Sequence, residues 1–381
     1  MSIPEVHLDT LAVHGGRDPE DDGGLAPSIR PATTFLRGED GDYPGGHQYS
    51  RSSNETRARL ESALAALEGG GEAVTFASGM AAASAVFMQL APGDHAVVSA
   101  DVYHGVIHFV KQWIVPRGVD VSFCETSDPD ALADAIRGNT RLIWFESPSN
   151  PEMKITAFAA VAELARARGI VTVCDSTLAS PVLQRPLEHG IDAVMHSSTK
   201  YLGGHSDMLG GVLVTRNAEL ARRLRAWQAE SGAVPSAFDC WLLLRSLPTL
   251  PLRVTRQSAS ALHIAQWLSE QNGIERVLYP GLASHPGHAV AREQMRAFGG
   301  VLSVCVDGSE RKARAFASAT TLFAQATSLG GVESLIEHRA SVEGDNRRSP
   351  GNLLRLSVGL EHPDDLLRDL AQALERVRDV N

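Results

Sequence analysis

Hydrophobic positions along the chain follow two different periods. Between about residues 56 and 245, short apolar runs rich in β-branched residues recur, and stretches with helical spacing separate them. This alternation predicts βαβ units that build an α/β domain around a mostly parallel sheet. The expected strands lie near residues 73–76, 95–99, 119–123, 141–145, 170–174, 192–196 and 211–215.

The pattern changes toward both ends of the chain. Residues 1–55 are rich in glycine, proline and polar residues, which predicts an arm with little regular structure. A long amphipathic stretch at about 250–272 precedes strand-like runs at 301–306 and 353–358, which alternate with helical patterns. Because 381 residues are too many for one ordinary core, we expect separate units. They are an N-terminal arm at 1–55, a large domain at 56–245 and a smaller C-terminal α+β domain at 246–381.

Charge and cysteine content exclude several classes of partner. The formal net charge is −10 with acidic and basic residues interspersed, so neither nucleic acid nor a membrane is an expected partner. Four widely spaced cysteines are predicted to be reduced core residues and not disulfides or metal ligands: Cys124, Cys174, Cys240 and Cys305. The N-terminus lacks a signal-peptide pattern, and no stretch is long enough to span a bilayer. We therefore expect a cytoplasmic protein.

One lysine stands in an unusual setting. Lys200 follows the hydroxyl residues Ser197, Ser198 and Thr199, precedes a glycine pair, and comes soon after a predicted buried strand at 191–195. A lysine held away from water can lose its proton and form a Schiff base with a carbonyl. The hydroxyl groups suit a phosphate. Together these features predict pyridoxal 5'-phosphate bound to Lys200, with Ser197 and Thr199 among the cofactor-binding residues.

A phosphate site is predicted where a strand meets a helix. Ser78, Gly79 and Met80 follow the apolar run 73–75 and precede the alanine-rich stretch 81–88, a good helix former. Backbone N–H groups and the dipole at a helix start favour bound phosphate. An ordinary strand–turn–helix would give the same pattern, so the prediction depends on its partners elsewhere in the chain.

Two residues at predicted strand ends would serve the cofactor ring. Asp175 follows the strand at 170–174, at the end where open α/β sheets bind ligands, and would keep the pyridine nitrogen protonated. Tyr103 follows the apolar run 96–98 and offers a face for ring stacking. Turn capping by Asp175 and simple packing by Tyr103 are the alternatives.

These motifs resemble the Cys/Met-metabolism family of pyridoxal-phosphate enzymes, which includes cystathionine γ-synthases, γ-lyases and β-lyases, methionine γ-lyases and O-acylhomoserine sulfhydrylases. The resemblance covers nearly the whole chain. It is carried by Tyr49-Ser50-Arg51, Ala77-Ser78-Gly79-Met80, the run from Glu146 to Pro151, the run from Ser197 to Asp207, the run from Ser328 to Leu335, and Arg355-Leu356-Ser357-Val358-Gly359. It implies the fold type I of pyridoxal-phosphate-dependent transferases, with helices on both faces of the large sheet.

The resemblance implies further site residues. In the family, the residues matching Tyr49 and Arg51 reach the cofactor phosphate of the neighbouring subunit. This implies a homotetramer, a dimer of dimers, with active sites shared across the dimer interface. Arg355 would hold the α-carboxylate of a small amino-acid substrate, with help from Asn150 and Ser328. Because Arg355 stands inside an apolar strand, it needs an anion, and a buried structural ion pair is the alternative.

The implied reaction is cleavage of a Cγ–S or Cγ–O bond in a sulfur-containing or γ-substituted amino acid. Lys200 would carry protons, with Tyr103 as a further acid or base. Release of 2-oxoacid and ammonia would make the chain cystathionine γ-lyase-like. Capture of a thiol would make it a γ-replacement synthase with the same machinery. An aminotransferase and a catalytically silent relative are the alternatives from other classes; the lysine setting and arm argue against the first, and the complete cofactor set against the second.

Several positions depart from the family pattern. Thr327 stands where γ-synthases and γ-lyases usually carry Glu, and His104 and Gly105 follow Tyr103 where methionine γ-lyases carry Cys two residues after the tyrosine. Arg339 begins a segment that lacks the family's common Met-Thr-His run. Thr327 weakens a strict cystathionine interpretation, and Thr327 and Leu329 do not match the aromatic pair typical of β-lyases. The residues after Tyr103 weaken the methionine γ-lyase interpretation. These departures predict an altered distal pocket around His104, Thr327 and Arg339 that tolerates an uncharged or differently charged leaving group; a surface or packing role is the alternative for each.

Overall fold

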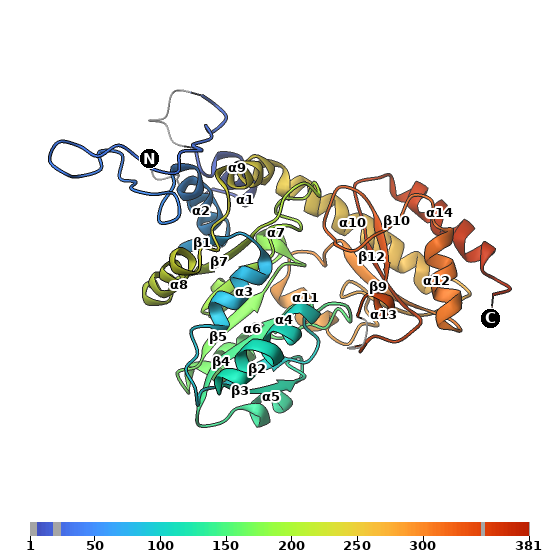
Figure 1. Ribbon diagram of the computed structural model, residues 1–381. Coiled ribbons are helices and arrows are strands. Elements are labelled where there is room, and N and C mark those ends of the chain that lie inside the picture. Colours follow the sequence, from blue (N-terminus) through green and yellow to red (C-terminus); the bar gives the residue numbers. More distant parts are fainter. Residues whose placement is uncertain (1–5, 18–23, 344–346, 381) are drawn as a thin grey trace.

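The computed structural model describes residues 6–17, 24–343 and 347–380, which form two sheets with helices packed against them (Figure 1). The larger sheet has the strand order β1-β7-β6-β5-β4-β2-β3. Its strands are β1 (Glu72–Phe76), β2 (His95–Ser99), β3 (Asp120–Cys124), β4 (Thr140–Glu146), β5 (Val171–Asp175), β6 (Ala193–His196) and β7 (Gly211–Thr215). Each agrees with an expected strand to within one residue.

Most neighbouring strands of this sheet are parallel, as expected. The exception is β7, which runs antiparallel to both β1 and β6. Alternate residues of β4 enter two different cores, because Trp144 packs on one face of the sheet and Ile143 on the other. The helices of this region are α2 (Glu55–Leu67), α3 (Gly79–Phe87), α4 (His104–Phe109), α5 (Pro129–Ala135), α6 (Phe158–Arg166), α7 (Ser180–Leu183), α8 (Ala218–Ser231) and α9 (Ala237–Ser246). The expectation of helices on both faces is therefore confirmed.

A long helix, α10 (Leu250–Ser269), leads into the smaller sheet, whose order is β10-β11-β12-β9-β8. Two of its strands were expected, and three were not predicted. The strands are β8 (Ile274–Leu278), β9 (Val301–Val306), β10 (Ala324–Gln325), β11 (Leu335–His338) and β12 (Leu353–Ser357). The accompanying helices are α11 (His288–Gln294), α12 (Glu310–Ala319), α13 (Arg339–Glu343) and α14 (Pro363–Arg376). A separate apolar core lies between this sheet and α10, α12 and α14.

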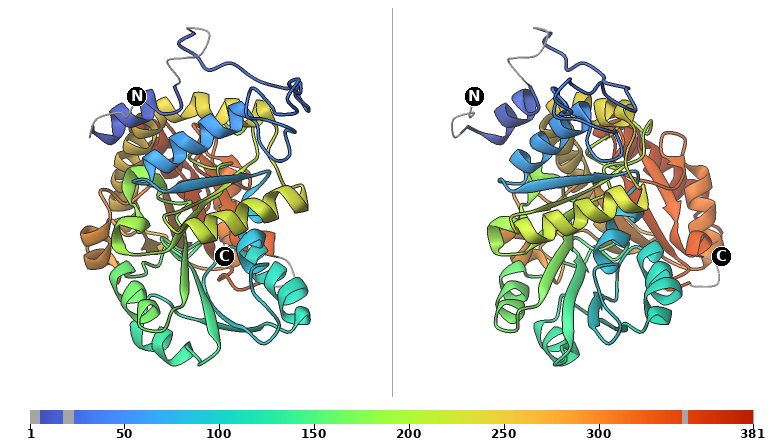
Figure 2. Two further views of the ribbon diagram at one scale, coloured as in Figure 1. Left: turned by 90° about the vertical axis from the view of Figure 1, so that its left-hand side faces the viewer. Right: turned by 60° about the vertical axis from the view of Figure 1, so that its left-hand side comes forward.

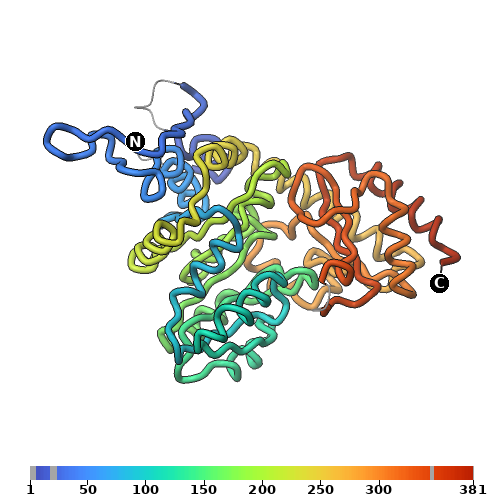
Figure 3. Tube along the Cα trace, in the orientation of Figure 1, coloured from blue at the N-terminus to red at the C-terminus, as the bar shows by residue number. Residues whose placement is uncertain are grey.

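The N-terminal arm is only partly irregular. Helix α1 (Leu8–His14) was not predicted, and it buries Leu8 and Ala12 in the core that also contains residues of α2 and α9. Between residues 24 and 54 the chain forms loops with one isolated bridge, from Thr34 to Tyr49. Figure 3 shows these loops on the side of the molecule away from the small sheet, and Figure 2 shows them at the top of the molecule.

Within the described ranges, no helix combines the length and the apolar character needed to cross a bilayer. The four cysteines are free; Cys174, Cys240 and Cys305 are buried, and Cys124 is half-buried.

Candidate active site

A cavity of about 320 Å³ lies between the two sheets. Its walls bring together every site residue predicted from the sequence except the two in the arm. These wall residues are Ser78, Gly79, Met80, Tyr103, Asn150, Asp175, Ser197, Thr199, Lys200, Ser328 and Arg355. The wall residues from the large sheet lie at or just after the carboxyl ends of its strands. Ligands of open α/β sheets bind at this edge.

The start of helix α3 forms one wall of this cavity. Ser78 is the N-cap residue, and its Oγ accepts a hydrogen bond of 3.1 Å from the N–H of Ala81. A Cβ atom on Gly79 would lie 2.8 Å from Cβ of Ser197, and one on Gly211 would lie 2.3 Å from the carbonyl oxygen of Ser78. Only glycine permits these approaches, which bring the first turn of α3 close to the hydroxyl residues. The wall is suited to a phosphate.

The residues before Lys200 also hold one another in place. The Oγ1 of Thr199 donates to the carbonyl of Gly210 at 3.2 Å and accepts from its N–H at 3.0 Å. The N–H of Ser197 donates to Oγ1 of Thr177 at 2.8 Å. Thr199 lines the cavity, but its hydroxyl group makes both of these hydrogen bonds to Gly210 and so stabilises the loop.

Two buried carboxyl groups lie side by side at the ends of β4 and β5, where Glu146 is paired with Asp175. Burial raises the pKa of Asp175, and hydrogen bonds from the N–H and hydroxyl of Thr177 oppose this shift. Burial also raises the pKa of Glu146 well above its usual range, and Asp175 adds to the effect. Glu146 accepts a hydrogen bond of 2.9 Å from the N–H of Tyr103 and so positions that residue. Glu146 was not predicted to be a site residue in its own right, although its place at the end of a predicted strand was a usable signal.

Lys200 lies in the cavity with its amine beside Ser328. Its Nζ donates to Oγ of Ser328 at 2.9 Å. Burial lowers the pKa of Lys200, and the positive charge of Arg355 lowers it further, while Glu337 opposes the shift. Ser328 has a φ of 92°, an unusual conformation for a residue with a side chain. Burial and the nearby guanidinium therefore both favour the neutral form of this amine.

Arg355 on β12 is buried and contacts Asn150, Ser328 and Glu337. Its Nη1 donates to Oδ1 of Asn150 at 3.1 Å, and its Nη2 donates to the carbonyl oxygen of Ser328 at 2.8 Å. Its Nη2 also lies 2.8 Å from Oε2 of Glu337, which is the buried ion pair that the sequence left open as the alternative. Burial lowers the pKa of Arg355 to about 10, and the guanidinium remains charged at neutral pH.

Glu337 is a site residue that was not predicted from the sequence. It lies on β11 directly opposite Arg355 on β12. The same Oε2 atom lies 2.6 Å from Nη1 of Arg339, so one carboxylate oxygen serves two guanidinium groups. Arg339 is only 3% exposed and lines the cavity too. Strand β11 has four residues, and no local pattern showed that a charged side chain there faces inward.

The two arm residues lie outside the cavity. The Nη1 of Arg51 donates to the carbonyl oxygen of Ala229 at 2.9 Å, and its guanidinium stands 5.6 Å from the centre of the Tyr49 ring. Tyr49 is 42% exposed. Within a single chain these residues therefore do not reach Lys200. Tyr103, by contrast, presents a partly exposed ring to the cavity.

Comparison with known proteins gives one consistent family. The family model for Cys/Met metabolism PLP-dependent enzymes matches residues 9–375. Cystathionine gamma-synthase of Mycobacterium tuberculosis (strain H37Rv) is 45% identical over 372 residues, with 96% of both chains covered. Cystathionine beta-lyase of Coxiella burnetii is 42% identical over 380 residues, covering 97% of this chain and 98% of the other. Cystathionine gamma-lyase of Dictyostelium discoideum is 41% identical over 378 residues with the same coverage.

Solved structures agree with this family. The crystal structure of metB from Corynebacterium glutamicum superposes with a TM-score of 0.95 at 41% identity, covering 98% of this chain and 99% of the other. Relatives named for three different activities thus have similar sequence identities to this chain, so the relatives alone do not identify its reaction.

Proposed function

Since the chain belongs to the Cys/Met metabolism family of PLP-dependent enzymes, we propose that it cleaves the Cγ–S or Cγ–O bond of a γ-substituted amino acid, in the manner of a cystathionine γ-lyase. The products would be a 2-oxoacid, ammonia and the released thiol or acid. The supporting observation is that one cavity joins Lys200, with its lowered pKa, to the buried carboxyl of Asp175 and the guanidinium of Arg355.

The residues of the cavity fit pyridoxal 5'-phosphate. A side chain at Gly79 would collide with Ser197, so the glycine leaves room for a phosphate at the start of α3. Asp175 would face the ring nitrogen, Tyr103 would stack on the ring, and Lys200 would hold the aldehyde carbon. When bound, the cofactor supplies an electron sink that weakens the bonds at Cα of an amino acid.

The chain's own groups would then bind the substrate and move its protons. Arg355 and the side chain of Asn150 would hold the α-carboxylate, which fixes Cα beside Nζ of Lys200. The neutral amine of Lys200 would remove the proton from Cα and return a proton toward the leaving group on Cγ. Ser328 holds that amine in place by its hydrogen bond. The hydroxyl of Tyr103 would supply a second proton donor.

A γ-replacement synthase is the second candidate, and a specific observation favours it. The relatives from Mycobacterium with 43–45% identity are named cystathionine gamma-synthase. Both reactions need the same residues until the γ-substituent has left. They differ in whether a thiol or water completes the turnover.

The two outcomes can be separated with the purified holoenzyme. We expect 2-oxobutanoate from cystathionine or from O-acyl esters of homoserine when no thiol is added. Adding cysteine should leave this product unchanged for a lyase, whereas a synthase should form a thioether at its expense. Release of pyruvate from cystathionine, without 2-oxobutanoate, would show cleavage at Cβ and contradict the proposal.

We also propose that the active site is shared across the dimer interface of a homotetramer. Arg51→Ala should then weaken cofactor binding by about 10- to 100-fold, because one charge-assisted phosphate contact is lost. An equal mixture of Arg51→Ala with Lys200→Ala chains, after subunit exchange, should regain roughly a quarter of the wild-type sites, since each hybrid dimer contains one intact site. Activity no higher than the average of the two variants alone would contradict a shared site.

A further inference from the structure

A turn at residues 149–154 carries Asn150 into the candidate active site, where the side-chain oxygen of Asn150 accepts the hydrogen bond from Arg355. The N–H of Met153 donates to the carbonyl oxygen of Ser149 at 3.2 Å and closes the turn. Met153 has a φ of 60°, which is unusual for a residue with a side chain. The position of Asn150 therefore depends on how this strained turn is fixed to the rest of the protein.

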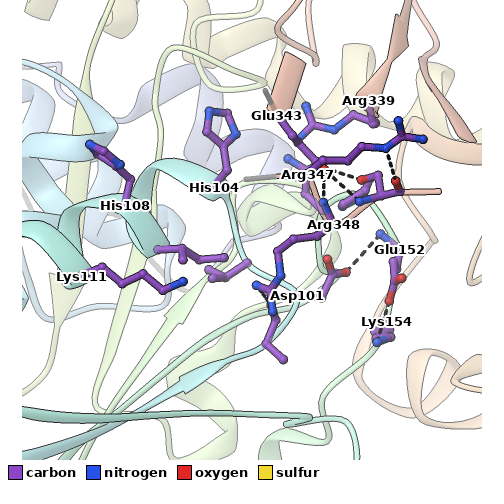
Figure 4. Close-up of a pocket in the computed structure, with 16 residues that line it drawn as sticks. Asp101, His104, His108, Lys111, Glu152, Lys154, Arg339, Glu343, Arg347 and Arg348 are labelled. Atoms are coloured by element: carbon purple, nitrogen blue, oxygen red, sulfur yellow. Dashed lines mark hydrogen bonds and ion pairs between the residues drawn. The ribbon is translucent and has the colours of Figure 1, made fainter. Parts of the chain in front are cut away.

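Asp101 fixes the turn from the large domain. It follows β2 by two residues and lines a cavity of about 600 Å³, which shares Asn150 with the first cavity (Figure 4). One carboxylate oxygen, Oδ2, accepts two hydrogen bonds from the turn. The hydroxyl of Ser149 donates one, and the N–H of Glu152 donates the other at 3.1 Å. These two donors lie on either side of Asn150 in the sequence.

The carboxylate of Asp101 is charged when it makes these contacts. Burial raises the pKa of Asp101 to about 6, and the hydrogen bond from Ser149 opposes this shift. The group is therefore mostly ionised at neutral pH, and both hydrogen bonds are charge-assisted. The nearby Tyr103 is fixed separately, because its N–H donates to Glu146 at 2.9 Å. Loss of the Asp101 carboxylate should thus act mainly on the turn.

The turn is also held at other points. The hydroxyl of Ser303 on β9 donates to the carbonyl oxygen of Pro151 at 2.7 Å, so the small sheet contacts the turn. At the end of the turn, the side chain of Lys154 forms an ion pair with Glu125 of the large domain. Asp101 differs from Glu125 in that it binds the residues that flank Asn150.

We propose that Asp101 is a positioning residue for the α-carboxylate of the substrate. By holding the turn at two points, it keeps the side chain of Asn150 beside the guanidinium of Arg355. This rests on the proposed function, which places the α-carboxylate on Asn150 and Arg355. Since both donors bind one oxygen, an amide at position 101 would still accept both hydrogen bonds, whereas a leucine would accept neither.

Hydrogen exchange tests the contact with the turn without any turnover. In the holoenzyme, Asp101→Leu should speed amide exchange of a peptide covering residues 149–154 by about 10-fold, because a charge-assisted bond to a backbone N–H is lost. Exchange in β5 should not change, and Asp101→Asn should behave like the wild type. Ser149→Ala, which removes one of the two donors, should give a similar increase and replaces Asp101→Leu if that variant does not fold. Unchanged exchange of the turn would overturn the proposal.

Two ligands that differ only at the α-carboxyl group test the consequence for binding. By calorimetry on the holoenzyme, wild type should bind norleucine more tightly than norleucinamide, in which a neutral amide replaces the carboxylate. Asp101→Leu should reduce this preference by about 10-fold, because a displaced Asn150 no longer contacts the carboxylate. Asp101→Asn should keep the preference. A preference that persists in full in Asp101→Leu would contradict the positioning role.

Glu125→Gln is the matched control, because it removes an acidic group that binds the same turn through Lys154. It should change the preference for norleucine by less than about twofold. An equal loss in Glu125→Gln and Asp101→Leu would mean that any loosening of the turn has this effect, and would overturn the proposal. A wild type without any preference for norleucine, combined with faster exchange in Asp101→Leu, would refute the carboxylate site of the proposed function and still confirm that Asp101 fixes the turn.

Discussion

Lys200→Ala should abolish turnover and the visible absorbance that bound pyridoxal phosphate gives the wild-type protein. The amine of Lys200 would be both the attachment point of the cofactor and the group that moves protons. Losing the acid–base role alone costs about 10²- to 10⁴-fold, and the loss of attachment adds to it. Absorbance of the purified variant and 2-oxoacid release measured together check this result.

Lys312→Ala offers a matched control, because Lys312 is a half-buried lysine on α12 and is not among the residues that line the cavity. It should retain wild-type absorbance and rate. The fold of Lys200→Ala should also survive, since the side chain makes a single described hydrogen bond, to Ser328. A folded Lys200→Ala protein that turns over substrate at the wild-type rate would end the assignment of this lysine.

The large sheet could be predicted from the sequence because its central strands are buried on both faces. Such strands are nearly continuous apolar runs, as in β2, and their pattern does not depend on distant partners. Strands β8 and β11 of the small sheet contain charged residues, Glu275, Arg276 and Glu337, which break the pattern. These strands can be recognised only when the strands that pair with them are known.

Helix α1 was missed for a related reason. It has seven residues, and its N-cap residue makes no side-chain cap hydrogen bond. An isolated helix of this length is not stable in water. Burial of Leu8 and Ala12 in the core shared with α2 and α9 stabilises helix α1. The residues of the helix alone do not indicate that contact.

The individual site residues were predictable from short motifs, but their connections were not. Ser78, Asp175 and Lys200 each follow a recognisable strand, and the sheet brings those strand ends together. The link between Arg355 and Arg339 depends instead on the antiparallel pairing that sets Glu337 opposite Arg355. Register between strands about 20 residues apart cannot be read from either strand alone.

The other large effect that we expect follows from substitution of Arg355. Arg355→Leu should raise KM for the amino-acid substrate by about 100-fold or more, because the α-carboxylate loses a forked, charge-assisted contact in a buried site. The value of kcat should fall less. Arg355→Lys should recover only part of the loss, since a lysine restores the charge but not the planar fork.

A purely structural role for Arg355 makes a different prediction. Removing one partner of a buried ion pair costs about 3–5 kcal/mol of folding stability, so Arg355→Leu should also unfold at a lower temperature. Glu337→Gln alone tests this role, because it removes the ion pair and leaves the guanidinium of Arg355 in place. If Arg355 binds the substrate, Glu337→Gln should lower the unfolding temperature but should raise KM far less than Arg355→Leu. If the two variants raise KM equally, Arg355 is only the partner of Glu337, and the α-carboxylate is held elsewhere.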